Sequence, residues 1–212
     1  MKPYVLDLTK EEALARLERI RKRGIQSYQP YHLFPDFVTP HKKEGFKRRI
    51  AAIHKAVGDP TGKRFLDLGC AVGWILYEFV FKGGTGIGVD ISENNIRTAT
   101  SLAKQYEVED KVEFYVANVY DYIMELDDHF DYIMVLNLLN HIIDQKGYEE
   151  GWEWLNVIST KCDRMICNHY SGVNQIPENI VKFTTFNKCE VIMQGDPYYN
   201  NMGRPLYEAL RT

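Results

Sequence analysis

A short loop and one carboxylate are the residues of this 212-residue chain best suited to bind a ligand. Small residues at 69, 71 and 73 follow an apolar segment ending at Leu68, and they allow a turn to pass close under a ligand into a helix N-terminus. Asp90 ends the next apolar segment about twenty residues further on, where a carboxylate can accept hydrogen bonds from ribose hydroxyls. Together these features predict a ligand that contains adenosine.

Alternating strands and helices are expected to position this loop. Strands are predicted over 63–68, 85–90, 112–117, 131–136 and 164–169, and residues with helical periodicity lie between most of them. Repeated strand–helix–strand units predict a parallel sheet, whose ligands lie beyond the carboxyl ends of the strands at the point where strand order reverses. A short helix near 177–182 and two strands over 189–194 and 205–210 complete the chain. No helix fits between those two strands, so we expect an antiparallel pair.

Two helices are predicted before the first strand. Thr9 and Glu12 form a capping-box pattern at the start of one, and Gly58 ends the other. The segment between them is rich in proline and aromatic residues without a period, which favours an ordered loop. We therefore divide the chain into residues 1–58, a helical arm with an aromatic loop packed on the core as a lid, and residues 59–212, the ligand-binding domain.

The spacing Asp67-x-Gly69-x-Ala71-x-Gly73 resembles the first motif of the seven-stranded S-adenosylmethionine-dependent methyltransferases. The resemblance covers about residues 60–211, including GVDIS at 88–92, FDYIMVLNLLNHI at 130–142 and RPLYEALR at 204–211. It implies an α/β fold with a Rossmann-like, doubly wound, seven-stranded sheet, mostly parallel with a C-terminal antiparallel strand, behind the N-terminal helical arm. It also implies S-adenosylmethionine as cofactor and methyl transfer as the reaction.

The same resemblance implies roles for individual residues. Gly69 and its neighbours would contact the methionine part of the cofactor, Asp90 the ribose, and Asn118 the adenine rim, with Asp121 as a competing candidate. Ala71 stands where the family usually has a glycine, and a methyl group is small enough for binding to survive. The full set of residues expected at the cofactor is Asp67, Gly69, Cys70, Ala71, Gly73, Trp74, Asp90, Ile91, Asn118, Val119 and Asn137. Ile91 and Val119 would sandwich the base, whereas Trp74 either walls the pocket or belongs to the core.

The methyl acceptor is expected beside the end of the fourth strand. His141 has a side chain of suitable pKa to be a general base for a hydroxyl acceptor, although a packing role is an alternative. His169 and Tyr170 are a second candidate pair after the fifth strand. The residues expected to bind substrate are Tyr28, Tyr31, His32 and Asn140. The segment Asn137–Asn140 lacks the Asn/Asp-Pro-Pro-aromatic motif, which argues against base or glutamine amines as acceptors.

Composition and charge indicate the cellular location and the kinds of partner to expect. The chain has no apolar run long enough to cross a bilayer, no secretory signal, and four scattered cysteines, so a cytoplasmic protein without a metal site is expected. Residues 1–64 carry 15 basic and 7 acidic side chains, a net +8, whereas the rest of the chain carries 11 and 22, a net −11. This asymmetry is compatible with a phosphate-bearing partner or with solvated helix faces.

We predict a small-molecule methyltransferase acting on a hydroxyl or amine of a metabolite that can carry a phosphate. A transfer-RNA methyltransferase that uses the basic arm is the alternative, because the order of aromatic loop, basic helix and motif faintly resembles enzymes that alkylate the wobble uridine. A non-catalytic adenosine-ligand binder and a nicotinamide oxidoreductase are further alternatives. The sequence identifies neither the acceptor nor the oligomeric state.

Overall fold

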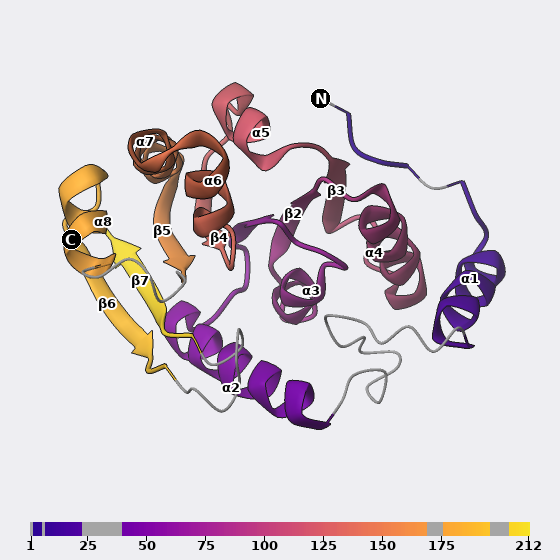
Figure 1. Ribbon diagram of the computed structural model, residues 1–212. Coiled ribbons are helices and arrows are strands. Elements are labelled where there is room, and N and C mark those ends of the chain that lie inside the picture. The colour runs from indigo at the N-terminus through magenta and orange to yellow at the C-terminus, as the bar shows by residue number, and fades with distance from the viewer. Residues whose placement is uncertain (1, 6, 23–39, 169–175, 196–203) are drawn as a thin grey trace.

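Seven strands form one sheet in the order β3-β2-β1-β4-β5-β7-β6 (Figure 1). The computed structural model describes residues 2–5, 7–22, 40–168, 176–195 and 204–212. The strands are β1 Arg64–Leu68, β2 Thr85–Asp90, β3 Val112–Val116, β4 Phe130–Val135, β5 Cys162–Cys167, β6 Lys188–Met193 and β7 Leu206–Leu210. The first five pair in parallel, and β7 is antiparallel to both β5 and β6. Strand order reverses between β1 and β4, where Leu68 lies opposite Val135.

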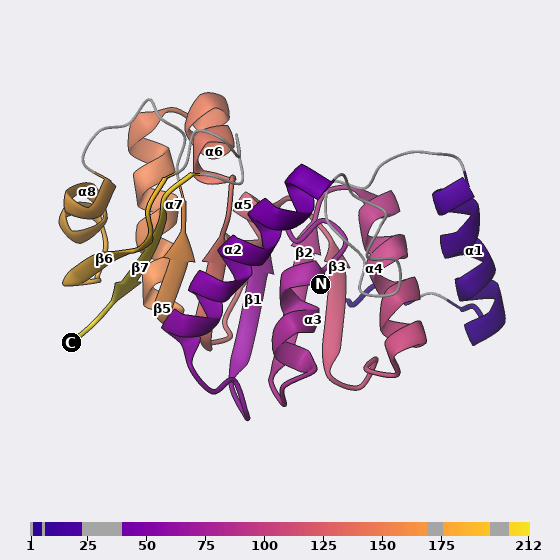
Figure 2. The same cartoon turned by 90° about the horizontal axis from the view of Figure 1, so that it is seen from below.

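Helices cover both faces of the sheet (Figures 1 and 2). They are α1 Lys10–Lys22, α2 Pro40–Val57, α3 Trp74–Val80, α4 Glu93–Tyr106, α5 Val119–Glu125, α6 Leu139–Lys146, α7 Tyr148–Thr160 and α8 Ile176–Phe183. Helices α2, α3 and α4 lie on one face, α5, α6 and α7 on the other, and α1 lies outside α4. Because both faces are covered, the central strands are apolar along nearly their whole length. No helix in the described part of the chain is long and apolar enough to cross a membrane.

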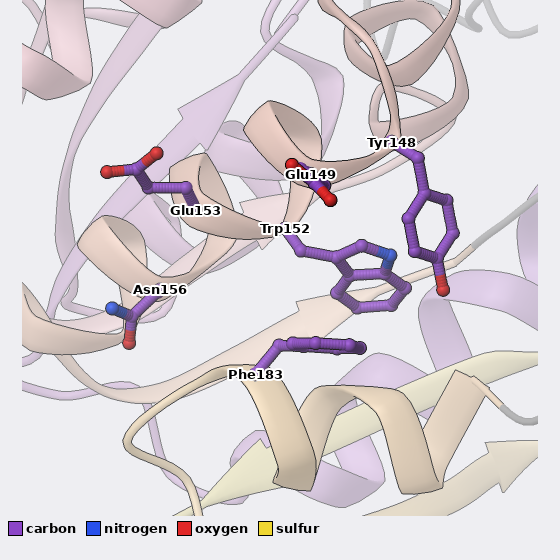
Figure 3. Close-up of a pocket in the computed structure, with 6 residues that line it drawn as sticks. All are labelled: Tyr148, Glu149, Trp152, Glu153, Asn156 and Phe183. Carbon is purple, nitrogen blue, oxygen red and sulfur yellow. The ribbon is translucent and has the colours of Figure 1, made fainter.

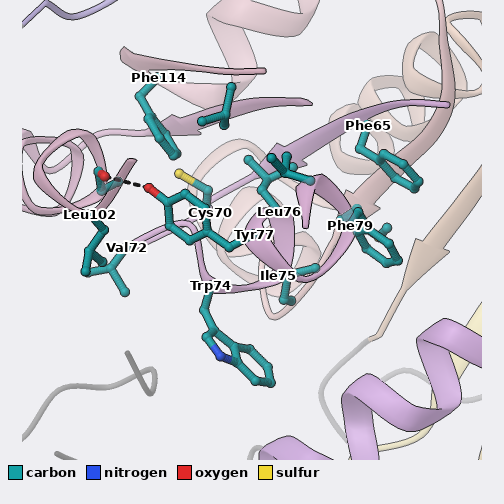
Figure 4. Packing of buried hydrophobic residues seen from close by; sticks show 14 of the residues in the cluster. Phe65, Cys70, Val72, Trp74, Ile75, Leu76, Tyr77, Phe79, Leu102 and Phe114 are labelled. Atoms are coloured by element: carbon teal, nitrogen blue, oxygen red, sulfur yellow. Dashed lines mark hydrogen bonds between the residues drawn. The ribbon is translucent and has the colours of Figure 1, made fainter. Parts of the chain in front are cut away.

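Helix α3 is the centre of the core on the first face (Figure 4). Phe79 stacks on Phe65 of β1 with ring centroids 4.3 Å apart, and the Tyr77 hydroxyl donates to the Ala99 carbonyl of α4. Trp74 meets the edge of Phe46, which lies on α2, at 5.1 Å. These contacts fix α3, and therefore the loop that precedes it, relative to the sheet and to α2.

The opposite core is built around α7. Trp152, Leu155 and Ile158 are buried on that helix, whereas Tyr148 is 47% exposed. Tyr148 lies at a groove of about 420 Å³ between α7 and α8, in which the Trp152 ring stacks on Phe183 (Figure 3).

Most of the predicted elements are present, with three corrections. The capping box forms as expected, since the Thr9 amide donates to Glu12 and the Glu12 amide donates to Thr9. The fifth strand, expected over 164–169, begins and ends two residues earlier. Two short helices, α5 and α6, were not expected. Each has few buried apolar residues, so the helical period is hardly visible in the sequence.

Candidate cofactor and acceptor site

The loop after β1 turns back through left-handed backbone conformations. Gly69, Ala71 and Gly73 have φ values of 71°, 50° and 77°. The amides of Gly69 and Cys70 both donate to the Val89 carbonyl, at 2.8 and 3.0 Å, so the loop is tied to the end of β2. A left-handed alanine is disfavoured by about 1 kcal/mol relative to glycine, so Ala71 needs a compensating contact.

Asp90 supplies that contact. Its Oδ2 accepts a hydrogen bond from the Ala71 amide at 2.9 Å, and its Oδ1 accepts from the Ser92 amide at 2.8 Å. The Asn95 side chain also donates to Oδ1, at 3.2 Å. One carboxylate therefore joins the loop after β1 to the first turn of α4. With three of about four acceptor positions occupied, it retains one, on Oδ2, for a ribose hydroxyl.

Asp67 is a buried acid below this loop. Its side chain is 2% exposed, and Oδ2 has no hydrogen-bond partner among the described residues. Burial, reinforced by the charge of Asp90, raises the pKa of Asp67 to about 8. The folded protein therefore holds Asp67 protonated at neutral pH.

This proton makes stability depend on pH. Asp67 is ionised in the unfolded chain above about pH 4 but keeps its proton in the folded state up to about pH 8. It therefore removes stability progressively as pH rises through that window, by about 1 kcal/mol per pH unit. Asp67→Asn lacks this titration, so the difference in unfolding free energy between wild type and variant should change steadily from pH 5 to 8 in urea denaturation. A difference independent of pH would contradict the buried, protonated state.

The loop after β4 lies directly on the loop after β1. A methyl group on Gly69 would be 3.6 Å from Leu138 Cδ1, so the two loops are in contact. Asn137 has φ 55°, a left-handed conformation. Asn168, 1% exposed after β5, accepts from the Asn137 amide at 2.6 Å and donates through Nδ2 to Asn137 Oδ1 at 2.8 Å. Arg204 also donates to that oxygen, at 3.3 Å.

Asn168→Ala should destabilise the protein by about 1–3 kcal/mol, because it removes both bonds to Asn137 and leaves a backbone amide without its acceptor. Asn94→Ala, which removes an exposed amide, is the matched control and should change stability by less than about 0.5 kcal/mol. Guanidinium denaturation of both variants makes the comparison. Equal stabilities would show that the Asn137–Asn168 pair is dispensable.

The expected adenine region has one exposed and one buried apolar side chain. Ile91, directly after Asp90, is 72% exposed, whereas Val119 is 8% exposed and packs in the core. The Asn118 side chain caps α5, with its oxygen accepting from the Tyr120 amide at 2.9 Å. The Ala117 amide donates to the Asp90 carbonyl, so these residues and the ribose candidate lie side by side.

The remaining predicted residues have different surroundings. His141 is exposed in the first turn of α6, and the buried Oδ1 of its neighbour Asn140 has no partner among the described residues. Cys70 and Trp74 are buried, the latter against Phe46. Tyr28, Tyr31, His32, His169 and Tyr170 lie outside the described residues.

Three residues of this site were missed by the sequence analysis: Asn95, Asn168 and Arg204. Asn168 was counted inside the fifth strand because that strand was placed two residues too late. With the correct boundary, Asn168 is the first residue after β5. Residues at the carboxyl ends of parallel strands are the ones expected to contact ligands. Asn95 and Arg204 carry no such signal.

The fold and the site together define a class of protein. The sheet is doubly wound and its strand β7 is antiparallel, as in Rossmann-like methyltransferases. The loop Gly69–Gly73 lies where strand order reverses, and it is hydrogen-bonded to Asp90 at the end of β2. Residues 60–206 match the family model described as a methyltransferase domain. The chain therefore belongs to the methyltransferase-domain family, whose cofactor is S-adenosylmethionine.

Individual proteins that this chain resembles are also methyltransferases. The bifunctional methyltransferase/kinase WbdD of Escherichia coli, an O-antigen chain terminator, is 27% identical over 165 residues, which are 73% of this chain and 23% of WbdD. The mitochondrial ubiquinone biosynthesis O-methyltransferase of Bos taurus is 26% identical over 57% of this chain and 33% of its own length. This chain thus spans a third or less of these relatives. Magnesium protoporphyrin IX methyltransferase from Synechocystis, crystallised with the cofactor, shares the fold with a TM-score of 0.64 and 17% identity over 99% of this chain and 100% of its own.

The residues present fit S-adenosylmethionine. The partnerless buried oxygen of Asp67 offers an acceptor to the ammonium of the methionine end, whose positive charge would favour ionisation of this carboxyl group, and Asp90 suits the ribose. The exposed Ile91 offers an apolar face to a planar base. Asp67 lies on β1, Asp90 ends β2 and Ile91 follows it. They would meet the methionine end, the ribose and the base in that order.

Proposed function

We propose that this chain transfers the methyl group of S-adenosylmethionine to an oxygen of a small-molecule acceptor. The observation that carries the proposal is the contact between the Gly69–Gly73 loop, tied to Asp90, and the loop after β4 that leads to His141. It supports the proposal because the loop expected at the cofactor and the imidazole of His141 follow neighbouring strands at the same edge of the sheet. Oxygen is favoured over nitrogen because the ubiquinone-pathway relatives are named O-methyltransferases. A transfer-RNA substrate has less support, because none of these relatives is named for RNA.

S-adenosylmethionine supplies an electrophilic methyl group on a sulfonium sulfur. The chain's own residues then have two tasks, which are to orient the reactants and to remove a proton from a hydroxyl acceptor. Asp67, Asp90, Asn118 and Ile91 are proposed to hold the cofactor, with Gly69, Ala71 and Gly73 shaping the cradle. Asn137 and Asn140 are proposed to face the acceptor, and His141 to accept its proton. Residues 1–58 are proposed as an arm over residues 59–212, since Phe46, Ile53 and Val57 of α2 pack into the sheet's core.

The proposal is tested by following labelled methyl groups. The protein is incubated with S-adenosylmethionine carrying a radioactive methyl group and with a cell extract divided into a small-molecule fraction and an RNA fraction. We expect label in the small-molecule fraction, unaffected by ribonuclease. Label that appears only in RNA and disappears after ribonuclease treatment would contradict the proposed acceptor class.

His141→Ala should lower kcat for a hydroxyl acceptor about a hundredfold while leaving cofactor affinity unchanged, because only proton removal is lost. His129→Ala is the control, since His129 is also exposed but precedes β4 at the opposite edge of the sheet, where it pairs with Asp163. Steady-state kinetics of both variants make the comparison. A wild-type kcat for the His141 variant would show that His141 is not the general base.

A further inference from the structure

Three arginines line a cavity between α1 and α4. The cavity has a volume of about 310 Å³ and is lined by Leu8, Glu12, Arg16, Arg19, Ile20 and Arg97. Helices α1 and α4 lie side by side (Figures 1 and 2), and the Lys10 ammonium pairs with Glu107 just after the last turn of α4. The two helices are therefore antiparallel. The second half of α1 consequently lies beside the first turns of α4, which begins at Glu93, three residues after Asp90.

The described side chains that line this cavity include more cations than acids. The Nε of Arg97 is buried and has no hydrogen-bond partner among the described residues. Arg19 is exposed, and its Nε donates to the Ala15 carbonyl of its own helix. Glu12 is the acid in the wall, but its carboxylate accepts the Thr9 amide in the capping box. Glu93, nearby on α4, accepts from the Tyr4 hydroxyl. Among the described residues that line the cavity, guanidinium groups thus outnumber carboxylates.

We propose that this arginine pocket, formed by Arg16, Arg19 and Arg97, binds the phosphate group of a small molecule. Guanidinium groups donate in a planar fork that matches phosphate oxygens, and two of them with different approach directions can enclose one group. Here one direction comes from α1 and the other from α4. The pocket lies between α1 and α4, on the β2–β3 side of the sheet, whereas the acceptor is proposed at the loop after β4. The phosphate compound is therefore a ligand separate from the methyl acceptor, and its binding does not depend on the proposed function.

The same surface does not suit an RNA backbone. Nucleic-acid binding needs a track of several phosphate contacts along one face. On α1 three acids, Glu11, Glu12 and Glu18, share the helix with the arginines, so the helix does not present an unbroken basic track. This distribution favours a single phosphate or diphosphate group over a polymer.

Titration calorimetry with inorganic pyrophosphate at about 0.15 M salt tests the pocket. Arg97→Gln and the exposed Arg19→Gln should each weaken binding about tenfold or more, because each removes a charged donor. Lys104→Gln is the matched control. It removes one positive charge from α4 two turns beyond Arg97, outside the pocket, and should change the affinity less than about twofold.

Three results would overturn the proposal: absence of pyrophosphate binding, equal weakening by Lys104→Gln, or tighter binding of a ten-nucleotide RNA with a steep dependence on salt. S-adenosylhomocysteine titrated into the same samples tests the cofactor edge separately. We expect its affinity to be unchanged in all three variants. Loss of pyrophosphate binding with S-adenosylhomocysteine binding intact locates the anion in the arginine pocket. Wild-type protein that binds pyrophosphate but not S-adenosylhomocysteine would contradict the proposed function and leave the pocket standing.

Discussion

Replacing Asp90 with alanine is expected to weaken S-adenosylmethionine binding by about 3–4 kcal/mol, or roughly two to three orders of magnitude in Kd. Two losses add up. The cofactor loses its ribose acceptor, and the Ala71 and Ser92 amides lose the carboxylate that holds both loops in place. Without that carboxylate, the left-handed Ala71 has no compensating contact, so the cradle is no longer preorganised.

Asp90→Asn separates the two losses. The amide oxygen can still accept from one of the two backbone amides, but the charge is gone and one acceptor position becomes a donor. We expect an intermediate Kd, about tenfold weaker than wild type, by isothermal calorimetry with S-adenosylhomocysteine. Unchanged affinity in Asp90→Ala would show that Asp90 is neither the ribose acceptor nor the organiser of the loop.

The second large effect is expected at Gly73. Its φ of 77° is left-handed, and a Cβ there would lie 2.8 Å from Phe114 Cζ and 3.3 Å from Tyr77 Cε2. Both rings are buried in the core around α3. Gly73→Ala should therefore lower the unfolding free energy by about 3–4 kcal/mol, from backbone strain and overpacking together. Cofactor affinity should fall with it, because α3 cannot start at the same place.

Gly62→Ala isolates the strain from the overpacking. Gly62 has a similar φ of 72°, but a Cβ there would meet no atom within 4 Å. We expect it to cost about 1 kcal/mol and to leave cofactor affinity unchanged. Chemical denaturation measures the first quantity and calorimetry the second. Equal costs for the two substitutions would mean that the contact with Phe114 does not limit the loop.

The sheet could be predicted from the sequence because its strands carry long apolar runs. Both faces of the central strands are buried, with Leu66 and Ile133 in one core and Phe65 and Met134 in the other, which gives a signal independent of the partner strand. The absence of a helix between β6 and β7 likewise predicted their antiparallel pairing correctly. Strand ends were less visible, because Asn168 follows the apolar residues Met165–Cys167 with no adjacent glycine or proline to mark a turn.

The site could be predicted only in part, for a different reason. Gly69, Gly73 and Asp90 are recognisable because their types and spacing follow from the turn and from the ligand. The contacts among them are not recognisable. That Asp90 bonds to Ala71, or that Asn168 supports Asn137 across the sheet, depends on distances between loops far apart in the sequence. The arginine pocket is similar, since Arg97 joins Arg16 and Arg19 only through the packing of α1 on α4.

The edge formed by Gly69–Gly73 and Asp90 is proposed to bind S-adenosylmethionine. Thermal unfolding with S-adenosylmethionine, S-adenosylhomocysteine and NAD, each at saturating concentration, tests it most directly. We expect the first two to raise the melting temperature by several degrees in wild type and to have little effect in Asp90→Ala, with NAD inactive in both. Stabilisation of the wild type by NAD alone would contradict the claim.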